Sequence, residues 1–194
     1  MKLPLIPNPD DELDSRNPLI IEIANVLTRE ECASLIARIE AAGPSEAPII
    51  SGGEFVMRPD IRNNTRVIFD DVPLATKLFE AVRPHVPERL EGEWYLCGAN
   101  ERLRCYRYAP GEYFRSHFDG AFHRSREERS LLTFMVYLNE CEAGGHTEFD
   151  DLGFSVAPKI GGALLFNHFL RHAGGEVRAG LKYAVRSDLM YRHR

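Results

Sequence analysis

The sequence predicts a mainly β, α+β fold in which two helices near the N-terminus pack on one face of a β-sheet. Two segments in the first half combine helix start signals with apolar residues at helical spacing. From about residue 93 onward, short β-rich runs are separated by Gly, Asn and Asp, which is typical of sandwiches and barrels. The length of 194 residues and the hydrophobic content of 44% match a single folded domain.

The N-terminal end begins with an arm and a first helix. Residues 1–17 are rich in Pro and Asp and are expected to form a loose arm, which an apolar run follows. Thr28 and Glu31 have the T-x-x-E spacing of a capping box, and Gly43 with Pro44 ends the apolar periodicity. A helix is therefore expected between these two signals.

The next segment contains a loop, a strand and a second helix. Residues 45–62 hold several Pro and Gly residues and predict a loop with one short strand at most. The run TRVIFDD predicts a strand, and Asp71 with Pro73 predicts the start of the second helix. The later β-rich runs are WYLCG, LRCYRYA, YFRSHFD, SLLTFMVYLN, TEFDD, FSVAPK, GALLFNHF and KYAVRSDLMY.

This order predicts one domain over residues 18–194, after the arm at 1–17. We expect a helical layer over about 18–92 and a β core over about 93–194, because neither half carries a complete set of packing partners.

Charge and composition exclude several classes of protein. The net charge is −5, with −7 in the first hundred residues and +2 in the rest, so the basic footprint of a nucleic-acid-binding protein is absent from the sequence. No apolar run reaches the roughly 18 residues of a membrane span. The acidic N-terminus does not have the pattern of a signal peptide, so a cytoplasmic location is expected. The four cysteines lack zinc-finger spacing.

The residues with the most specific chemistry are His117 and Asp119. On extended backbone, residues two apart project to the same face, so both side chains can bind one ion. About 55 residues later, His168 and His172 are both candidates for a third ligand. Two imidazoles and one carboxylate on one face of Fe(II) leave neighbouring positions open, as in non-haem oxygenases.

Further motifs follow these residues in a specific order. Together they resemble the prolyl 4-hydroxylase-type 2-oxoglutarate- and Fe(II)-dependent dioxygenases, over about residues 106–191. The motifs are Tyr137-Leu138-Asn139, Gly144-Gly145-x-Thr147-x-Phe149, Val156-x-Pro158-x-x-Gly161 and His172-x-Gly174-x-x-Val177-x-x-Gly180-x-Lys182-Tyr183.

The resemblance implies a double-stranded β-helix (jelly roll) with the N-terminal helices packed on one sheet. It implies His117, Asp119 and His172 as the metal ligands and catalytic residues. His172 is favoured over His168 because Lys182 follows it by ten residues.

The same resemblance assigns residues to the cosubstrate. Lys182 would pair with the distal carboxylate of 2-oxoglutarate, and Tyr137 and Thr133 lie on one strand face that would support it. Tyr106 resembles the tyrosine that lines the family's cosubstrate pocket, but Tyr108 points the same way and is the alternative. A buried carboxylate needs such a cation and such hydroxyl donors.

The implied activity is hydroxylation of a C–H bond, with release of succinate and CO2. The expected substrate is a prolyl residue of a protein or peptide; the alternative is a free amino acid or small metabolite, and the second alternative is a non-catalytic metal-binding sensor or scaffold. The cofactors would be Fe(II), 2-oxoglutarate and O2, with ascorbate as a further candidate. Arg66, Tyr108 and Arg186 are candidate substrate residues, although Arg186 could equally form a structural ion pair with Asp188. The residues leave the oligomeric state open.

Overall fold

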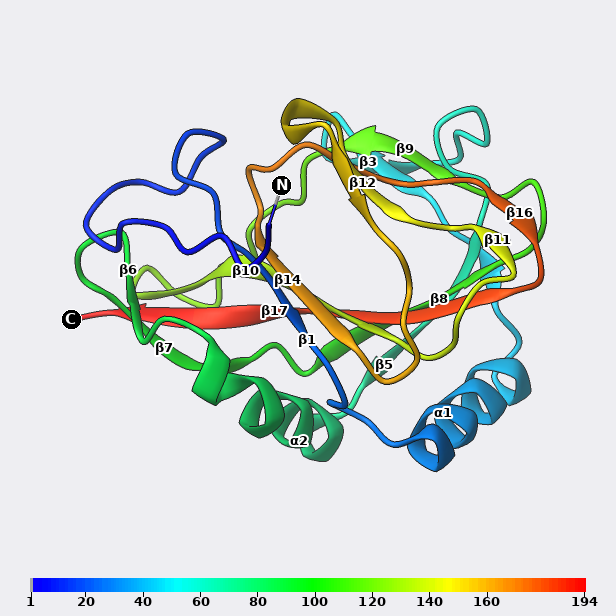
Figure 1. Ribbon diagram of the computed structural model, residues 1–194, viewed down its shortest axis with the longest axis horizontal. Helices are drawn as coiled ribbons and strands as arrows, with labels where there is room; N and C mark the ends of the chain where they lie inside the picture. The colour runs from blue at the N-terminus through cyan, green and yellow to red at the C-terminus, as the bar shows by residue number, and fades with distance from the viewer. Residues whose placement is uncertain (1) are drawn as a thin grey trace.

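Antiparallel strands are the main secondary structure of the computed structural model, which describes residues 2–194 (Figure 1). Within this range nine strands form a major sheet, ordered β1-β14-β10-β17-β8-β5-β2, with β7 paired to β17 and β6 to β7. These strands are β1 (Ile20–Ile23), β2 (Ser45–Glu46), β5 (Thr65–Asp70), β6 (Arg89–Leu90), β7 (Trp94–Ala99), β8 (Arg102–Tyr108), β10 (Glu128–Tyr137), β14 (Ala163–Asn167) and β17 (Lys182–His193).

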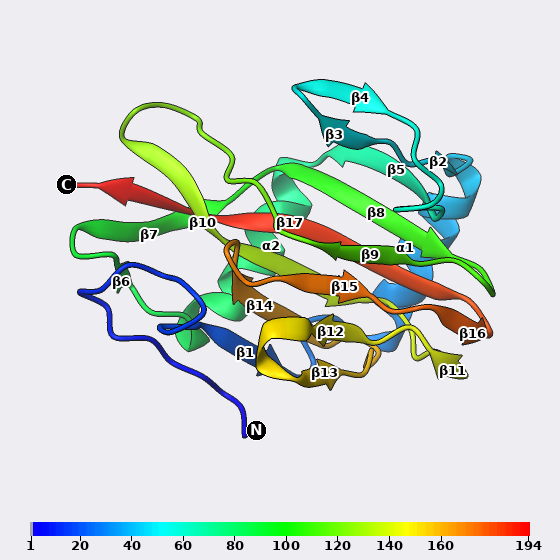
Figure 2. The same cartoon turned by 90° about the horizontal axis from the view of Figure 1, so that it is seen from above.

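A smaller sheet lies across the inner face of the major sheet (Figures 1 and 2). This minor sheet has the order β13-β12-β15-β9. Its strands are β9 (Phe114–His117), β12 (Thr147–Phe149), β13 (Phe154–Val156) and β15 (His172–Gly174). Two short two-stranded pairs complete the described strands: the hairpin of β3 (Ile49–Ser51) with β4 (Glu54–Val56), and β11 (Ala143–Gly144) with β16 (Val177–Ala179). The predicted jelly roll is confirmed.

Both predicted helices are present, and both lie on the outer face of the major sheet (Figure 1). Helix α1 (Arg29–Ala41) begins with the complete capping box: Glu31 N–H donates to the Thr28 hydroxyl, and Thr28 N–H donates to the Glu31 carboxylate. Helix α2 (Val72–Val82) is capped by Asp71, which accepts from Leu74 N–H at 3.0 Å. Neither helix, nor any other in the described part of the chain, has the length and apolar character needed to cross a membrane.

The two faces of the major sheet have different partners. In β10, Phe134 and Val136 belong to the large apolar cluster that α1 and α2 cover. Met135 and Tyr137 point the other way and pack between the two sheets, with Phe149 of β12 and Phe166 of β14. Successive side chains of a strand therefore alternate between the helix side of the sheet and the inner side, where polar residues also lie.

Three features differ from the sequence prediction. Residues 45–62 contain three short strands instead of one, because β2 pairs with β5 and β3 pairs with β4. The expected helical layer also supplies β1, which pairs with β14, and the predicted strand β5 joins the major sheet beside β8. The arm is attached rather than loose: Leu13 is 1% exposed, and Leu5 forms a bridge with Ile20.

Candidate active site

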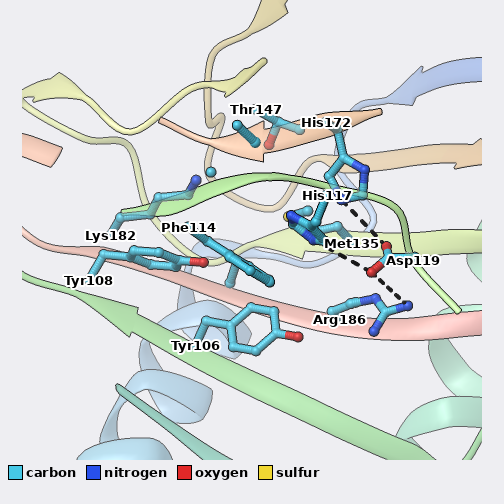
Figure 3. Close-up of a pocket in the computed structure, with 13 residues that line it drawn as sticks. Tyr106, Tyr108, Phe114, His117, Asp119, Met135, Thr147, His172, Lys182 and Arg186 are labelled. Atoms are coloured by element: carbon cyan, nitrogen blue, oxygen red, sulfur yellow. Dashed lines mark ion pairs between the residues drawn. The ribbon is translucent and has the colours of Figure 1, made fainter. Parts of the chain in front are cut away.

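Two paired strands of the minor sheet bring His117 and His172 together (Figure 3). His117 ends β9, His172 begins β15, and the two are register partners. The carboxylate of Asp119 faces both rings: His117 Nε2 is 3.7 Å from Oδ1 and His172 Nε2 is 3.5 Å from Oδ2. One donor atom from each of the three residues lies within 4.8 Å of the others. We call these three residues the His/Asp cluster.

Both imidazoles present an unprotonated nitrogen to the cluster. His117 Nδ1 lies 2.9 Å from the Arg115 carbonyl and His172 Nδ1 lies 3.0 Å from the Leu170 carbonyl. A carbonyl only accepts, so Nδ1 carries the proton and Nε2 keeps its lone pair. Burial and the neighbouring His172 lower the pKa of His117 to about 4, and burial lowers the pKa of His172. The rings are therefore neutral at pH 7, which is the form that binds a metal.

Asp119 is held as a carboxylate by two partners. Its burial alone would raise its pKa, but the charge of Arg186 brings the pKa well below the usual value. Arg186 NH2 lies 3.2 Å from Asp119 Oδ1, and Thr133 Oγ1 donates to Oδ2 at 2.6 Å. Both oxygens are thus oriented by groups outside the His/Asp cluster.

His168 lies behind Asp119 and outside the cluster. Its Nδ1 is 3.0 Å from Thr133 Oγ1 and its Nε2 is 2.8 Å from Ser130 Oγ. Because the Thr133 hydroxyl donates to Asp119, it accepts from Nδ1–H of His168, and Nε2 accepts from Ser130. Both ring nitrogens are therefore engaged, and burial lowers the ring's pKa to about 4. Of the two histidines that the spacing allowed, the structure brings His172 to the cluster.

A narrow cavity separates the His/Asp cluster from Lys182, which lies at its opposite end (Figure 3). Lys182 is 2% exposed and forms no ion pair with any residue in 2–194. Burial lowers the pKa of its ammonium to about 8. The free space in the cavity is about 30 Å³, room for small molecules such as water. A larger ligand must therefore move the side chains that line the cavity, which include Tyr106, Tyr108, Phe114, Met135 and Thr147.

The tyrosines and threonines divide into wall residues and supporting residues. Both Tyr106 and Tyr108 line the cavity, and Tyr108 is the one beside Lys182, whose Nζ lies 5.1 Å from its ring centre. Tyr137 is one layer back, where its hydroxyl meets Thr147 Oγ1 at 2.7 Å. Thr133 is also behind the wall, against Asp119.

The two hydroxyl groups expected to support the cosubstrate are hydrogen-bonded to other side chains in the structure. Thr147 lines the cavity in front of Tyr137, whose ring centre lies 5.7 Å from Lys182 Nζ, and Thr133 donates to the carboxylate of Asp119. The support of the cosubstrate by Tyr137 and Thr133 stays a prediction. Thr147 was identified in the sequence only as the last position of G-G-x-T. The G-G-x-T motif could have indicated the position of Thr147, because the two glycines precede the strand that carries this threonine.

A wider cleft opens on the other side of the cluster and contains the arginines. Its volume is about 600 Å³, and its wall includes Arg66 and Arg186. It shares Tyr106 and Arg186, as well as the His/Asp cluster residues His117 and Asp119, with the narrow cavity. Arg186 forms the ion pair with Asp188 that was considered for it, at 2.9 Å, and also pairs with Asp119, while its role toward a substrate stays a prediction.

Comparison with known proteins agrees with this geometry. Residues 103–187 match the model of the 2OG-Fe(II) oxygenase superfamily, which confirms the resemblance expected from the motifs. A protein of Acanthamoeba polyphaga mimivirus is 32% identical over 112 residues, which cover 48% of this chain and 46% of that protein. The prolyl 4-hydroxylase subunit alpha-2 of Gallus gallus is 26% identical over 178 residues, which cover 87% of this chain and 31% of that protein. The chain thus spans less than half the length of these relatives.

Solved structures share the fold. A viral collagen prolyl hydroxylase from Paramecium Bursaria Chlorella virus-1, in its 2OG complex, has a TM-score of 0.66 at 23% identity, with 89% of this chain and 96% of that chain covered. A Pseudomonas putida prolyl-4-hydroxylase has a TM-score of 0.61 at 19% identity, with 90% and 92% covered. At these identities the likeness establishes the architecture.

Proposed function

We propose that this chain, whose residues 103–187 match the 2OG-Fe(II) oxygenase superfamily, is a dioxygenase that hydroxylates a C–H bond with 2-oxoglutarate as cosubstrate. The observation that carries the proposal is the pairing of two features across one cavity. One is a buried cluster of two neutral imidazoles and a carboxylate, and the other is a buried lysine without an acidic partner in the described chain. The first fits a divalent metal and the second fits an anion.

The donor set fits Fe(II). Nε2 of His117, Nε2 of His172 and a carboxylate oxygen of Asp119 would be the protein ligands, which is the two-histidine, one-carboxylate set of non-haem Fe(II) oxygenases. The Nδ1–H groups already donate to backbone carbonyls and fix the rings, as supporting groups do at metal sites. Thr133 and Arg186 fix the carboxylate in the same way.

The narrow cavity fits 2-oxoglutarate once its walls have moved. Lys182 would receive the distal carboxylate, and the cost of burying an unpaired ammonium would then be offset by a charge-assisted hydrogen bond. Thr147, which Tyr137 orients, offers a hydroxyl from the wall. Phe114 stacks on His117 with ring centres 3.6 Å apart, so rotation of this phenylalanine is one way to make room between the lysine and the His/Asp cluster.

The reaction converts R–H, 2-oxoglutarate and O2 into R–OH, succinate and CO2. One oxygen atom enters the substrate and the other enters succinate, so the equation balances without a further reductant. Bound Fe(II) would supply the activation of O2, and the protein would supply position and exclusion of water. Lys182 orients the cosubstrate, while the wide cleft gives the substrate access to the cluster.

Peptidyl proline is the substrate we propose, because relatives and structural neighbours are named as prolyl hydroxylases. A free amino acid or small metabolite is the rival substrate, and a metal-binding scaffold without turnover is the rival function. The fold accommodates many substrates, so the site must be tested directly.

The test has a binding arm and a turnover arm. Anaerobic titration should show Fe(II) binding, followed by 2-oxoglutarate binding, in the wild-type protein. Succinate formation is then screened against prolyl peptides and free amino acids, with and without ascorbate to test the expected ascorbate dependence. Turnover with prolyl peptides supports the proposal, turnover only with free amino acids moves the substrate to the metabolite class, and metal binding without any turnover favours the scaffold.

Paired histidine variants test the ligand assignment. His172→Ala should abolish turnover and weaken Fe(II) binding, since it removes a donor, and His117→Ala and Asp119→Ala should do the same. His168→Ala is the matched control. His168 is also buried, but it contacts the hydroxyl of Thr133, 35 residues away in sequence, and not the cluster. It should retain Fe(II) affinity. Loss of the metal in His168→Ala with retention in His172→Ala would contradict the assignment.

A further inference from the structure

The wide cleft beside the His/Asp cluster is lined by five arginines. Three adjacent strands supply most of them, since β5, β8 and β17 lie side by side in the major sheet. Arg66 in β5 is the register partner of Tyr106 in β8, and Arg104 in β8 is the partner of Arg186 in β17. Partners across neighbouring strands project to the same face. The arginines that line the cleft are Arg62, Arg66, Arg102, Arg104 and Arg186.

Three of these arginines are already paired with acids. Arg186 pairs with Asp119 and Asp188, Arg104 lies 3.5 Å from Asp188, and Arg102 pairs with Asp70 at 2.9 Å. The charge of Asp119 is also required by the metal in the proposed function. The acids of the cleft are thus fully engaged.

Arg62 and Arg66 form no ion pair within residues 2–194. Arg62 is 4% exposed; its Nε donates to Asn64, and its NH2 is buried without a hydrogen-bond partner. Its guanidinium lies over the rings of Tyr106 and Phe114, at 4.8 and 4.5 Å from their centres. Arg66 is half-buried, and its burial and the charge of Arg62 lower its pKa. Two adjacent guanidinium groups without an anion are costly in this setting, and a bound anion would relieve that cost.

The shape of the cleft favours a peptide over a small anion. Its volume of about 600 Å³ exceeds the needs of one amino acid. Its rim carries three exposed aromatic rings: Phe55 (73% exposed), Phe118 (57%) and Phe122 (37%). Phe55 lies on the β3–β4 pair, which projects beyond β5 at the open side of the molecule (Figure 2). Exposed aromatic side chains around a polar centre are typical of surfaces that bind polypeptide.

We propose that the substrate is an acidic peptide segment, in which an Asp or Glu close to the hydroxylated residue binds to Arg62 and Arg66. This inference rests on the proposed function, because it assigns the wide cleft to the substrate of that same site. The arginine pair would hold the carboxylate by charge-assisted hydrogen bonds, for which a planar guanidinium is well suited. The neighbouring residue would then lie at the His/Asp cluster.

The test uses amidated, N-acetylated proline peptides in matched pairs that differ only in Asp/Glu against Asn/Gln. Their binding is measured by anisotropy on wild-type protein loaded anaerobically with Fe(II) and 2-oxoglutarate. The acidic peptide should bind at least about tenfold more tightly, and added salt should reduce the difference. Arg66→Gln should remove this preference and leave the affinities for Fe(II) and 2-oxoglutarate unchanged. Arg178→Gln, the same substitution at an exposed position away from the cleft, should retain the preference.

The outcomes separate this inference from the proposed function. Equal binding of both peptides, or an unchanged preference in Arg66→Gln, overturns the acidic-peptide assignment. Binding that requires a free C-terminal carboxylate, tested with the non-amidated peptides, also overturns it in favour of an α-carboxylate ligand. Failure of the wild-type protein to bind Fe(II) and 2-oxoglutarate overturns the proposed function itself. Arg62→Met provides a second variant, whose thermal unfolding shows whether it folds.

Discussion

Lys182 keeps a positive charge in a nearly closed cavity, and this position destabilises the protein when no anion is bound. Burial lowers its pKa from 10.5 to about 8, so the unfolded chain binds the proton more strongly than the folded one between these pH values. The cost at neutral pH is on the order of 3 kcal/mol at most. Stability should therefore increase as the pH is raised from about 8 toward 10.5, as far as this group is concerned.

Lys182→Met tests both aspects of this residue. The variant should raise the free energy of unfolding without cosubstrate by about 1–3 kcal/mol, because the buried charge is removed. It should weaken 2-oxoglutarate binding by roughly ten- to a hundredfold, through loss of a contact of about 1.5–3 kcal/mol. Urea unfolding and anaerobic titration measure the two effects. Lys159→Met is the control, since Lys159 is exposed; unchanged cosubstrate affinity in Lys182→Met would contradict the clamp.

The same ammonium predicts how cosubstrate affinity depends on pH. An anion binds the protonated lysine, so its pKa is higher in the complex than in the free protein. The dissociation constant should stay level below the free-state pKa of about 8, and should increase by up to roughly tenfold per unit above it. Isothermal titration calorimetry between about pH 6.5 and about pH 9.5, a range that spans this pKa, measures the slope. A Lys182→Met protein with the same slope would show that another group is responsible.

For individual residues, the sequence indicated which side chains lie near the site but not which of them contact one another. His117 and Asp119 are close in sequence, so their pairing follows from local geometry. The placement of Thr133 against Asp119, and of Thr147 in front of Tyr137, depends on how loops return strands to one another. No spacing rule specifies those contacts, so the sequence could not predict them.

Helix α1 depends on a reciprocal pair of hydrogen bonds at its first turn. Thr28→Ala removes the hydroxyl that accepts from Glu31 N–H, at 3.2 Å, and should lower the free energy of unfolding by about 1 kcal/mol. Chemical denaturation measures this loss. Ser34→Ala, within the exposed part of the same helix, is the control and should be neutral or slightly stabilising, because alanine is the better helix former. Equal effects at the two positions would show that the cap has no special role.

Long elements with a clear apolar pattern were predictable, and short ones were not. The runs that became β10 and β17 contain 10 and 12 strand residues, and both were expected as strands. The strands within residues 45–62 have two or three residues each. Segments that short carry no periodicity of their own, and their pairing with β5 or with each other decides their conformation.

A buried leucine is one of the contacts that connect the N-terminal arm to the rest of the molecule. Leu13 is 1% exposed and belongs to the apolar cluster that also contains residues of β10 and β17. Leu13→Ala should lower the free energy of unfolding by about 2–5 kcal/mol, because it leaves a cavity in that cluster. Ile6→Ala is the matched control, since Ile6 is 57% exposed, and should change stability by less than about 0.5 kcal/mol. A neutral Leu13→Ala would mean that the arm is not part of the cooperative fold.

The overall architecture followed from the order of helices and strands, but the extent of the major sheet did not. The sequence predicted no strand in the apolar run that forms β1. Its partner β14 lies about 140 residues later in the chain, so nothing local indicates the pairing. The strand TRVIFDD was expected, but its position beside β8 was not, because strand order depends on contacts distant in sequence. The composition of such a segment shows that it is apolar but does not show which strand it pairs with.

The two faces of strand β17 have different surroundings. Lys182, Ala184, Arg186 and Asp188 face the inner side, while Tyr183, Val185 and Leu189 belong to the helix-side cluster. A substitution on the inner face changes the ligand environment and leaves the helix-side residues in register. A one-codon insertion within the strand would instead exchange the two faces for all residues on one side of it. Divergence among descendants of this gene should therefore proceed in β17 by point substitution at alternate positions, with insertions and deletions confined to the loops on either side.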